Sequence, residues 1–365
     1  MKNNWQKVKL GDICGYSRSR IPISEVNLHN YVSTENLLKE RGGKIIAGKI
    51  PEQSNFYEYN KGCTLVSNIR PYFKKIWFAD IRGGCSNDVL VYTPNKGIND
   101  KWLYYLLSQD SFFDFVMSGH KGTKMPRGDK SQIMKFSVAL PPLDEQKKIA
   151  EILSALDDKI ELNNKINRNL EAQAQAIFKS WFIDFEPFKN GKFIDSELGK
   201  IPEGWKVGNL SDIANITMGQ SPNGNSYNEK KIGMIFFQGR AEFGWRFPRN
   251  RLYTAAPKRI AERDSVLLSI RAPVGDINKA LERCCIGRGL ATLTSNHKTF
   301  LYYKMQSIRH LLDVYNGEGT VFGSINKNTL QQIRTIIPID SEIIRFELKL
   351  KVVDELIRNN YIENL

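Results

Sequence analysis

Three short stretches contain residue types found in catalytic or nucleotide-binding motifs, but each lacks a necessary part. GKIIAGKI (residues 43–50) has the glycines and lysine of a phosphate-binding loop, yet Ile50 stands where a hydroxyl would hold magnesium. NIRPYF (68–73) loosely matches the Asn-Pro-Pro-Tyr of adenine methyltransferases, but an arginine interrupts it and no glycine-rich cofactor loop accompanies it. DFEPFK (184–189) has the acid-x-acid and lysine of nucleases, at the end of an expected helix where structural use is favoured. We therefore predict no catalytic residue and no bound cofactor.

The histidines and cysteines do not form a metal site by spacing. The four histidines, His29, His120, His297 and His310, are widely separated, and the five cysteines show no paired spacing. A serine–histidine–aspartate set stays open, since no spacing identifies one. No apolar run approaches the roughly 18 residues of a membrane span, and the N-terminus lacks the apolar core of a signal peptide. We expect a reduced, cytoplasmic protein with no metal and no membrane partner.

The chemistry that the composition does favour is binding to a polyanion. The chain of 365 residues has a net charge of +14, and the excess is segregated. Residues 1–142 carry 21 Lys+Arg against 12 Asp+Glu, and residues 191–340 carry 21 against 13. Residues 143–190 (7 against 9) and 341–365 (4 against 5) are nearly neutral. Two basic blocks separated by neutral stretches indicate two nucleic-acid-binding modules.

Clusters of residues suited to DNA contacts lie in glycine- and aromatic-rich segments of both blocks. Lysine and arginine neutralise phosphates, and arginine, lysine, asparagine and glutamine read base edges. Solvated surface charge is about as good an explanation for any one of them, but clusters on loops favour function. The predicted DNA-binding residues of the first block are Asn36, Lys39, Arg41, Arg70, Lys74, Lys75, Lys121, Lys124, Arg127 and Lys130. Those of the second block are Gln238, Arg240, Arg246, Arg249, Arg251 and Arg271.

The sequence segments that must position these clusters occur twice along the chain, as an internal repeat. NWQKVKLGDI (4–13) returns as EGWKVGNLSDI (203–213), and GCTLVSNIRPYFKKI (62–76) as RDSVLLSIRAPVGDI (263–277). The Leu-Tyr-Tyr at 103–105 returns at 301–303, and order is kept while the loops differ. Each copy reads as short strands rich in Val, Ile, Tyr and Phe, then a short helix, one more strand and a long helix. The segment FFQGRAEFGWRFPRNR (236–251) occupies the place of YVSTENLL (31–38).

The long helices carry a heptad-like seam. The first can begin near Asp144, after two prolines, and run to about Phe182, which is about 58 Å of helix at 1.5 Å per residue. A shift of 197 residues brings the seam back in the second helix, including its asparagines. An apolar stripe usually packs on its own domain, but two matching seams favour antiparallel pairing with each other, and seam asparagines fix register. The predicted helix-pairing residues are Ile149, Leu153, Leu156, Ile160, Asn163, Asn167, Leu170, Phe346, Leu350, Val353, Ile357 and Asn360.

These elements predict an α+β fold. Two pseudo-repeated strand-rich recognition domains, residues 1–142 and 189–340, are separated by a long antiparallel two-helix coiled-coil spacer, formed by residues 143–188 and by a short second helix, 341–365. Two basic modules on a rigid rod suit a two-part target on double-stranded DNA, whose half-sites recur about every 34–36 Å on one face.

The chain resembles the DNA-specificity subunit of type I restriction-modification systems. The likeness is carried by LPPLDEQKKIAEILSALDDKIELNNKIN (140–167), AIFKSWFIDFEPF (176–188), GWKVGNLSDI (204–213) and SIRAPVGDI (269–277), and it spans the whole chain. It implies a non-catalytic subunit whose two domains each read half of a bipartite, asymmetric site and whose helices dock two methyltransferase subunits. Motor-nuclease subunits would complete an adenine methyltransferase and ATP-dependent restriction endonuclease, with S-adenosylmethionine, ATP and magnesium on those partners.

One departure from the family pattern leaves alternatives open. The second helix stops at Leu365, where the family's second helix normally runs as long as the first. A short or truncated, phase-variable allele with impaired assembly is one alternative. A stand-alone nucleic-acid enzyme is another, and methylation or cleavage by the purified chain would favour it. A scaffold for protein partners is a third, for which specific duplex binding would be absent.

Overall fold

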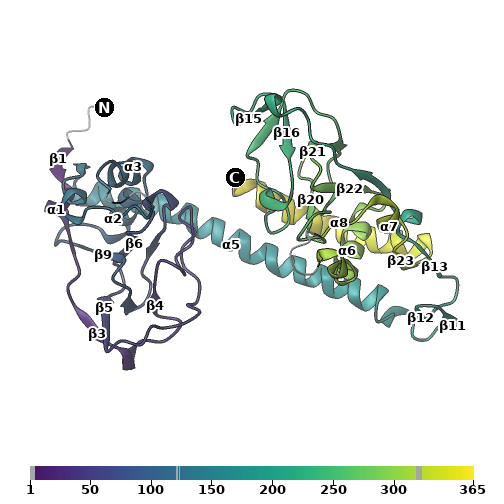
Figure 1. The fold of residues 1–365 in the computed structure, drawn as a ribbon. Helices are drawn as coiled ribbons and strands as arrows, with labels where there is room; N and C mark the ends of the chain where they lie inside the picture. Colours follow the sequence, from purple (N-terminus) through teal and green to yellow (C-terminus); the bar gives the residue numbers. More distant parts are fainter. Residues whose placement is uncertain (1–4, 121, 123, 318–322) are drawn as a thin grey trace. The chain divides into compact units, whose positions relative to one another are not determined.

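The computed structural model describes residues 5–120, 122, 124–317 and 323–365. The chain divides into two compact units, Met1–Lys159 and Ile160–Leu365 (Figure 1). The helix α5, Leu143–Phe182, contributes residues to both units.

The first unit is built on two four-stranded sheets. One has the order β2 (Cys14–Tyr16), β9 (Val89–Pro94), β6 (Thr64–Ser67), β7 (Ile76–Phe78), and its neighbours are antiparallel. The other has the order β3 (Arg20–Pro22), β5 (Asn55–Tyr59), β8 (Gly83–Cys85), β4 (Tyr31–Val32), with β4 and β8 parallel. A separate antiparallel pair joins β1 (Gln6–Lys9) to β10 (Ser137–Leu140). The helices are α1 (Leu10–Ile13), α2 (Asp100–Leu107), α3 (Asp110–Ser118) and α4 (Lys130–Ile133).

The second unit repeats this plan. Its first sheet has the order β14 (Asn215–Met218), β22 (Leu290–Thr294), β19 (Val266–Ser269), β20 (Ile277–Lys279). Its second has the order β15 (Tyr227–Asn228), β17 (Leu252–Thr254), β16 (Met234–Phe237), β21 (Cys284–Ile286), β18 (Ile260–Ala261). Two antiparallel pairs join β13 (Lys206–Asn209) to β23 (Arg334–Ile337) and β11 (Phe193–Ser196) to β12 (Gly199–Pro202). The helices are α6 (Lys298–Ser307), α7 (Lys327–Gln331) and α8 (Asp340–Glu363).

The sheets confirm the internal repeat strand by strand. In the first sheets, β2, β9, β6 and β7 correspond to β14, β22, β19 and β20. In the second, β5, β8 and β4 correspond to β18, β21 and β16, and the unusual parallel pairing recurs, with Val32 opposite Cys85 and Phe236 opposite Cys285. The edges differ, because β3 extends the first unit's sheet beside β5, whereas β17 and β15 extend the second unit's sheet beside β16. The predicted fold class is confirmed.

Local contacts explain where the helices begin. Asn99 caps α2, because its side chain accepts a hydrogen bond from the Trp102 N–H at 2.9 Å. The paired prolines 141 and 142 precede α5, and Pro142 accepts the first helical bond from the Gln146 N–H at 3.0 Å. The buried Gln146 side chain accepts from the Asn99 N–H and donates to the Pro141 carbonyl, both at 2.9 Å. This one glutamine ties the start of α5 to the start of α2.

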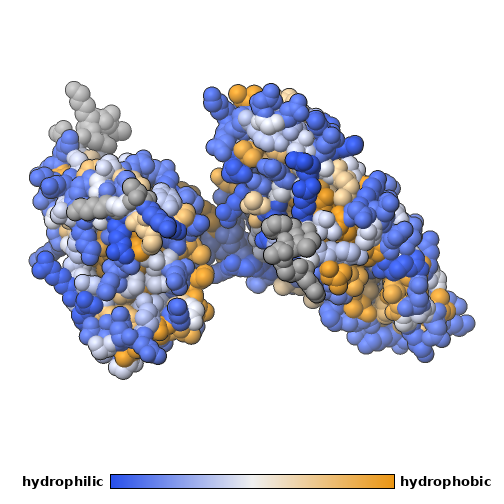
Figure 2. All heavy atoms as spheres, in the orientation of Figure 1, coloured by the Kyte–Doolittle hydropathy of each residue, from blue (hydrophilic) through white to orange (hydrophobic). Residues whose placement is uncertain are grey.

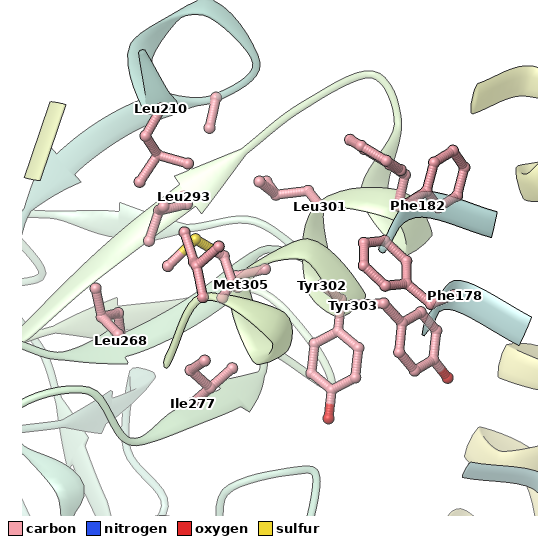
Figure 3. Packing of buried hydrophobic residues seen from close by; sticks show 14 of the residues in the cluster. Phe178, Phe182, Leu210, Leu268, Ile277, Leu293, Leu301, Tyr302, Tyr303 and Met305 are labelled. Carbon is pink, nitrogen blue, oxygen red and sulfur yellow. The ribbon is translucent and has the colours of Figure 1, made fainter. Parts of the chain in front are cut away.

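The core of the second unit includes both long helices. Phe178 and Phe182 of α5 point toward Leu301 and Tyr303 of α6 (Figure 3). Phe346 of α8 meets both phenylalanines, with ring centroids 5.6 and 5.1 Å apart. Burial of each such ring stabilises the fold by about 1.5–3 kcal/mol. The helix pair is therefore part of this unit's core rather than an appendage to it.

Candidate nucleic-acid interface

The predicted basic residues of the first unit fall into two groups. In one, Lys39 lies over the Phe73 ring at 4.0 Å, and Arg41 and Lys74 both reach Asp110 at the start of α3, Lys74 at 2.8 Å. Hydrogen bonds from Lys74 and Arg41 lower the pKa of the Asp110 carboxyl. Arg41 also donates to the Ser108 carbonyl at 2.5 Å. Arg41 and Lys74 therefore share one carboxylate. Glu40 lies 4.0 Å from Arg41, so that with Lys39 the patch stays net positive.

The second group gathers around Arg70. The backbone there is left-handed (φ 50°), and the Arg70 N–H donates to the Pro126 carbonyl at 2.8 Å. A bridge between Ile69 and Arg127 brings the loop that carries the exposed Lys124, Arg127 and Lys130 beside Arg70. Arg127 lies 3.2 Å from Asp88. Lys75 is half-buried and donates to the Thr34 carbonyl, and burial lowers its pKa. Lys121 lies outside the described residues.

The second unit presents its predicted residues from the corresponding places. Gln238 follows β16 and is exposed, as are Arg249 and Arg271. Arg240 lies 2.9 Å from Asp276, and Arg251 lies 2.7 Å from the buried Glu242. Arg271 forms a bridge with Ser324, as Ile69 does with Arg127 in the first unit. On the face visible in Figure 2, hydrophilic residues predominate over both units.

Two predicted DNA-binding residues are corrected by the structure. Asn36 is buried, and its amide donates to the Tyr31 and Ile45 carbonyls, both at 2.9 Å, so it shapes the turn after β4. Arg246 is 1% exposed and its guanidinium pairs with Glu171 and Asp354. A side chain whose polar atoms are used inside the protein is not available to DNA, so neither residue belongs to the interface.

The cluster around Arg246 was not predicted. Glu171 comes from α5, Asp354 from α8 and Lys279 from β20. The Lys279 ammonium lies 2.6 Å from Asp354. Burial would raise the pKa of Asp354, but the charges of Arg246 and Lys279 and the hydrogen bonds it accepts hold that pKa below its usual value. The available sequence signal was two acidic residues beside the seam positions Leu170 and Val353.

Within the second unit, α5 and α8 run antiparallel with the asparagines at their contact. The Asn360 amide donates to Asn167 Oδ1 at 3.0 Å, and the Asn163 amide donates to Asn364 Oδ1 at 2.9 Å. Residues further along α5 therefore contact residues earlier in α8, as expected for an antiparallel pair. Phe346, Leu350 and Ile357 are buried at this contact, and Val353 and Leu170 are half-buried.

The early part of the predicted seam behaves differently. Leu156 is 58% exposed and Ile160 is also exposed, so that the pairing of these two residues stays a prediction. At this end of the contact the Asn364 amide lies 3.5 Å from the Ile160 carbonyl. Leu153 is half-buried, and Ile149 packs against the core of its own unit.

The sequence profile of the type I restriction modification DNA specificity domain matches this chain twice, over residues 2–172 and 202–363. The chain belongs to this family. The two matches each include one strand-rich unit and most of a long helix, as the internal repeat requires.

Several proteins with sequences similar to this chain are named as specificity subunits of type I restriction enzymes. This chain is 36% identical over 280 residues to the type I restriction enzyme MjaX specificity subunit of Methanocaldococcus jannaschii, and the match covers 74% of this chain and 65% of that protein. It is 24% identical to the HindI specificity subunit of Haemophilus influenzae, covering 99% and 96%. The match to the MjaIX specificity subunit covers 52% of that protein, so the chain spans about half to two thirds of these archaeal relatives.

A solved structure shares the fold. The type I restriction-modification S subunit from M. genitalium aligns with a TM-score of 0.57 at 14% identity, over all of this chain and 96% of that one. Among the described residues, no cluster of histidine, cysteine or acidic side chains is arranged to hold a metal ion. None of the helices in that part of the chain combines the length and apolarity needed to cross a bilayer.

Proposed function

We propose that this chain is the sequence-specificity subunit of a type I restriction-modification complex, in which each unit reads one half of a bipartite, asymmetric site on double-stranded DNA. The observation that carries the proposal is one sheet architecture built twice, with unlike basic loops at equivalent places. The loop after β4 carries Lys39 and Arg41, and the loop after β16 carries Gln238, Arg240 and Arg249. Equal scaffolds with unequal reading loops suit a target with two unrelated halves.

The helices are the proposed docking surface for two methyltransferase subunits. On α8 the residues Ile344, Leu348, Val352 and Leu356 recur every four positions and are exposed, Leu348 by 71%. They lie outside the seam with α5, in which Phe346, Leu350 and Ile357 are buried. An exposed apolar stripe on a helix is typical of a surface that another helix covers.

The proposed division of labour leaves catalysis to the partners. The methyltransferase subunits would bind S-adenosylmethionine and modify an adenine in each half, and motor-nuclease subunits would use ATP and magnesium to translocate and cleave at unmodified sites. Such a complex would act in the cytoplasm. The chain's own part is to place the partners by contacts to phosphates and base edges.

The test is to express the chain with its cognate methyltransferase subunit in a methylation-free host and to map modified adenines across the genome. The expected result is one two-part motif with a fixed gap and two unlike halves. A palindromic or contiguous motif would contradict two independently reading units. Modification or cleavage by the purified chain alone would contradict the non-catalytic assignment. A complex that forms but modifies nothing would favour a short allele with impaired assembly.

A further inference from the structure

A buried ionic cluster ties a surface loop of the second unit to both paired helices. One Arg246 nitrogen, Nη1, pairs with Glu171 of α5, and Nη2 lies 2.5 Å from Asp354 Oδ1 of α8. Lys279 of β20 lies 2.6 Å from the other oxygen of Asp354. The Thr299 hydroxyl donates to Asp354 Oδ2 at 3.0 Å. Arg246 lies in a loop outside both helices, and its side chain connects α5 to α8.

The charges of this cluster balance, and its geometry is demanding. Two cations, Arg246 and Lys279, face two carboxylates, and all four residues are more than nine-tenths buried. The single Tyr303 hydroxyl proton serves the same two carboxylates, since its oxygen lies 3.3 Å from Asp354 Oδ1 and 3.4 Å from Glu171 Oε2. Burying ion pairs contributes little net stability, because desolvation offsets their attraction, and their best-attested use is to specify one register. A guanidinium fork that must meet two carboxylates at once suits that use.

The backbone around Arg246 is held as firmly as its side chain. The Lys279 N–H donates to the Arg246 carbonyl at 2.8 Å, and the Gly244 N–H donates to Asn278 Oδ1 at 3.1 Å. Three residues further on, the Arg249 N–H donates to the Glu242 carbonyl at 2.8 Å. The segment 238–251, which carries the exposed Gln238, Arg240, Arg249 and Arg251, is therefore fixed to β20 and to both helices.

The internal repeat singles out the arginine. Tyr105 and Tyr303 are the last residues of the repeated Leu-Tyr-Tyr, and each contacts an aspartate of a long helix. The Tyr105 hydroxyl donates to Asp157 of α5 at 2.7 Å, as Tyr303 does to Asp354 of α8. Asp157 is exposed in its unit, whereas Asp354 is buried under Arg246. The tyrosine–aspartate contact is common to both units, and the buried arginine clamp belongs to the second.

We propose that Arg246 is a positioning residue that sets the second unit's reading segment, residues 238–251, against the α5–α8 pair, and so restricts the length of the gap between the two DNA half-sites. The inference rests on the proposed function. Arg246 does not touch DNA. It acts by holding the segment 238–251 in place, in which Gln238 and Arg249 are exposed.

The test variant is the double substitution Arg246→Met with Glu171→Gln in the full chain, assembled with its methyltransferase subunit. It removes one charge of each sign and leaves Asp354 paired with Lys279. This choice avoids the unpaired buried carboxylate of the single Arg246→Met change, which would threaten folding. The matched control is Arg334→Met with Glu197→Gln, an exposed ion pair of the same unit.

The readout is affinity for duplexes that carry the mapped motif with its gap lengthened or shortened by one base pair. Wild type and control should bind the native gap and reject the altered ones. In the test variant we expect the preference for the native gap to fall by about tenfold, the effect of one mismatched base pair, with recognition of the first half-site unchanged. A purely structural role would lower the active fraction for all duplexes alike.

Two outcomes would overturn the inference: an unchanged gap preference in a variant whose circular dichroism and melting match wild type, or an equal loss at both half-sites. If wild type itself shows no bipartite preference, the proposed function fails before the clamp is tested. The two failures are therefore distinguishable.

Discussion

Asn360 of α8 donates its side-chain amide to Asn167 of α5 at 3.0 Å, and Asn167 in turn donates to the Ile357 carbonyl at 3.1 Å. This polar contact lies in a helix seam that also contains the buried apolar residues Phe346 and Leu350. A polar pair at such a place lowers stability relative to an apolar one, but it pairs well in a single register.

The asparagine contact predicts strong non-additivity. Asn167→Leu should destabilise the second unit by about 1–3 kcal/mol, because it leaves the Asn360 amide half-buried without its partner. Asn167→Leu combined with Asn360→Leu should recover that loss, because neither partner then remains unsatisfied. A double-mutant cycle on the free energy of unfolding measures the coupling. Simple addition of the two single effects would contradict a direct contact.

A buried lysine predicts an unusual dependence of stability on pH. Lys304 of α6 is buried, and burial lowers the pKa of its ammonium from 10.5 to about 8. Between these values the unfolded chain binds more protons than the folded one, so the free energy of unfolding should rise with pH, by up to about 3 kcal/mol. Below pH 8 the ammonium is charged in both states and the cost of its burial stays constant.

Lys304→Met isolates this effect. Unfolding in urea at pH values from 7 to 10.5 should show a difference between wild type and variant that shrinks as the pH rises. Parallel pH profiles for the two proteins would show that the lysine is not enclosed as described.

The exposed stripe on α8 predicts a partner-specific loss. Leu348→Glu with Val352→Glu should abolish co-purification with the methyltransferase subunit, because two carboxylates would be buried in the contact. Since both side chains are about 70% exposed, the free energy of unfolding of the isolated chain should change by no more than about 0.5 kcal/mol. Val314→Glu, at a position 78% exposed, is the control. Normal assembly of the double variant would exclude this face of α8 from docking.

Much of the architecture could be predicted from sequence because the repeat multiplies weak signals. A single strand of four residues such as β6 is hard to identify, but its recurrence as β19, with the following Ile-Arg, supports both. The asparagines at 163 and 167 could be placed at the seam because they recur 197 residues later. The differing edge strands, β3 in one unit and β17 with β15 in the other, lie where the sequences diverge.

The errors have a common physical origin. Arg246 lies in a glycine- and aromatic-rich segment with three other arginines, and local sequence cannot distinguish the one that is buried. Its carboxylate partners lie 75 residues before it and 108 residues after it, so only the tertiary fold brings them together. Asn36 differs because its amide satisfies carbonyls of its own turn, a common use of asparagine in loops.

Selection from a pool of randomised duplexes tests most directly whether each unit reads its own half-site. The chain, assembled with its methyltransferase subunit, would be compared with two variants, Lys124→Ala with Arg127→Ala in the first unit and Gln238→Ala with Arg249→Ala in the second. We predict that each variant relaxes sequence preference in one half of the motif, by about 1–3 kcal/mol for each lost base contact, and leaves the other half unchanged. Loss of preference in both halves with either variant would contradict two independent reading units.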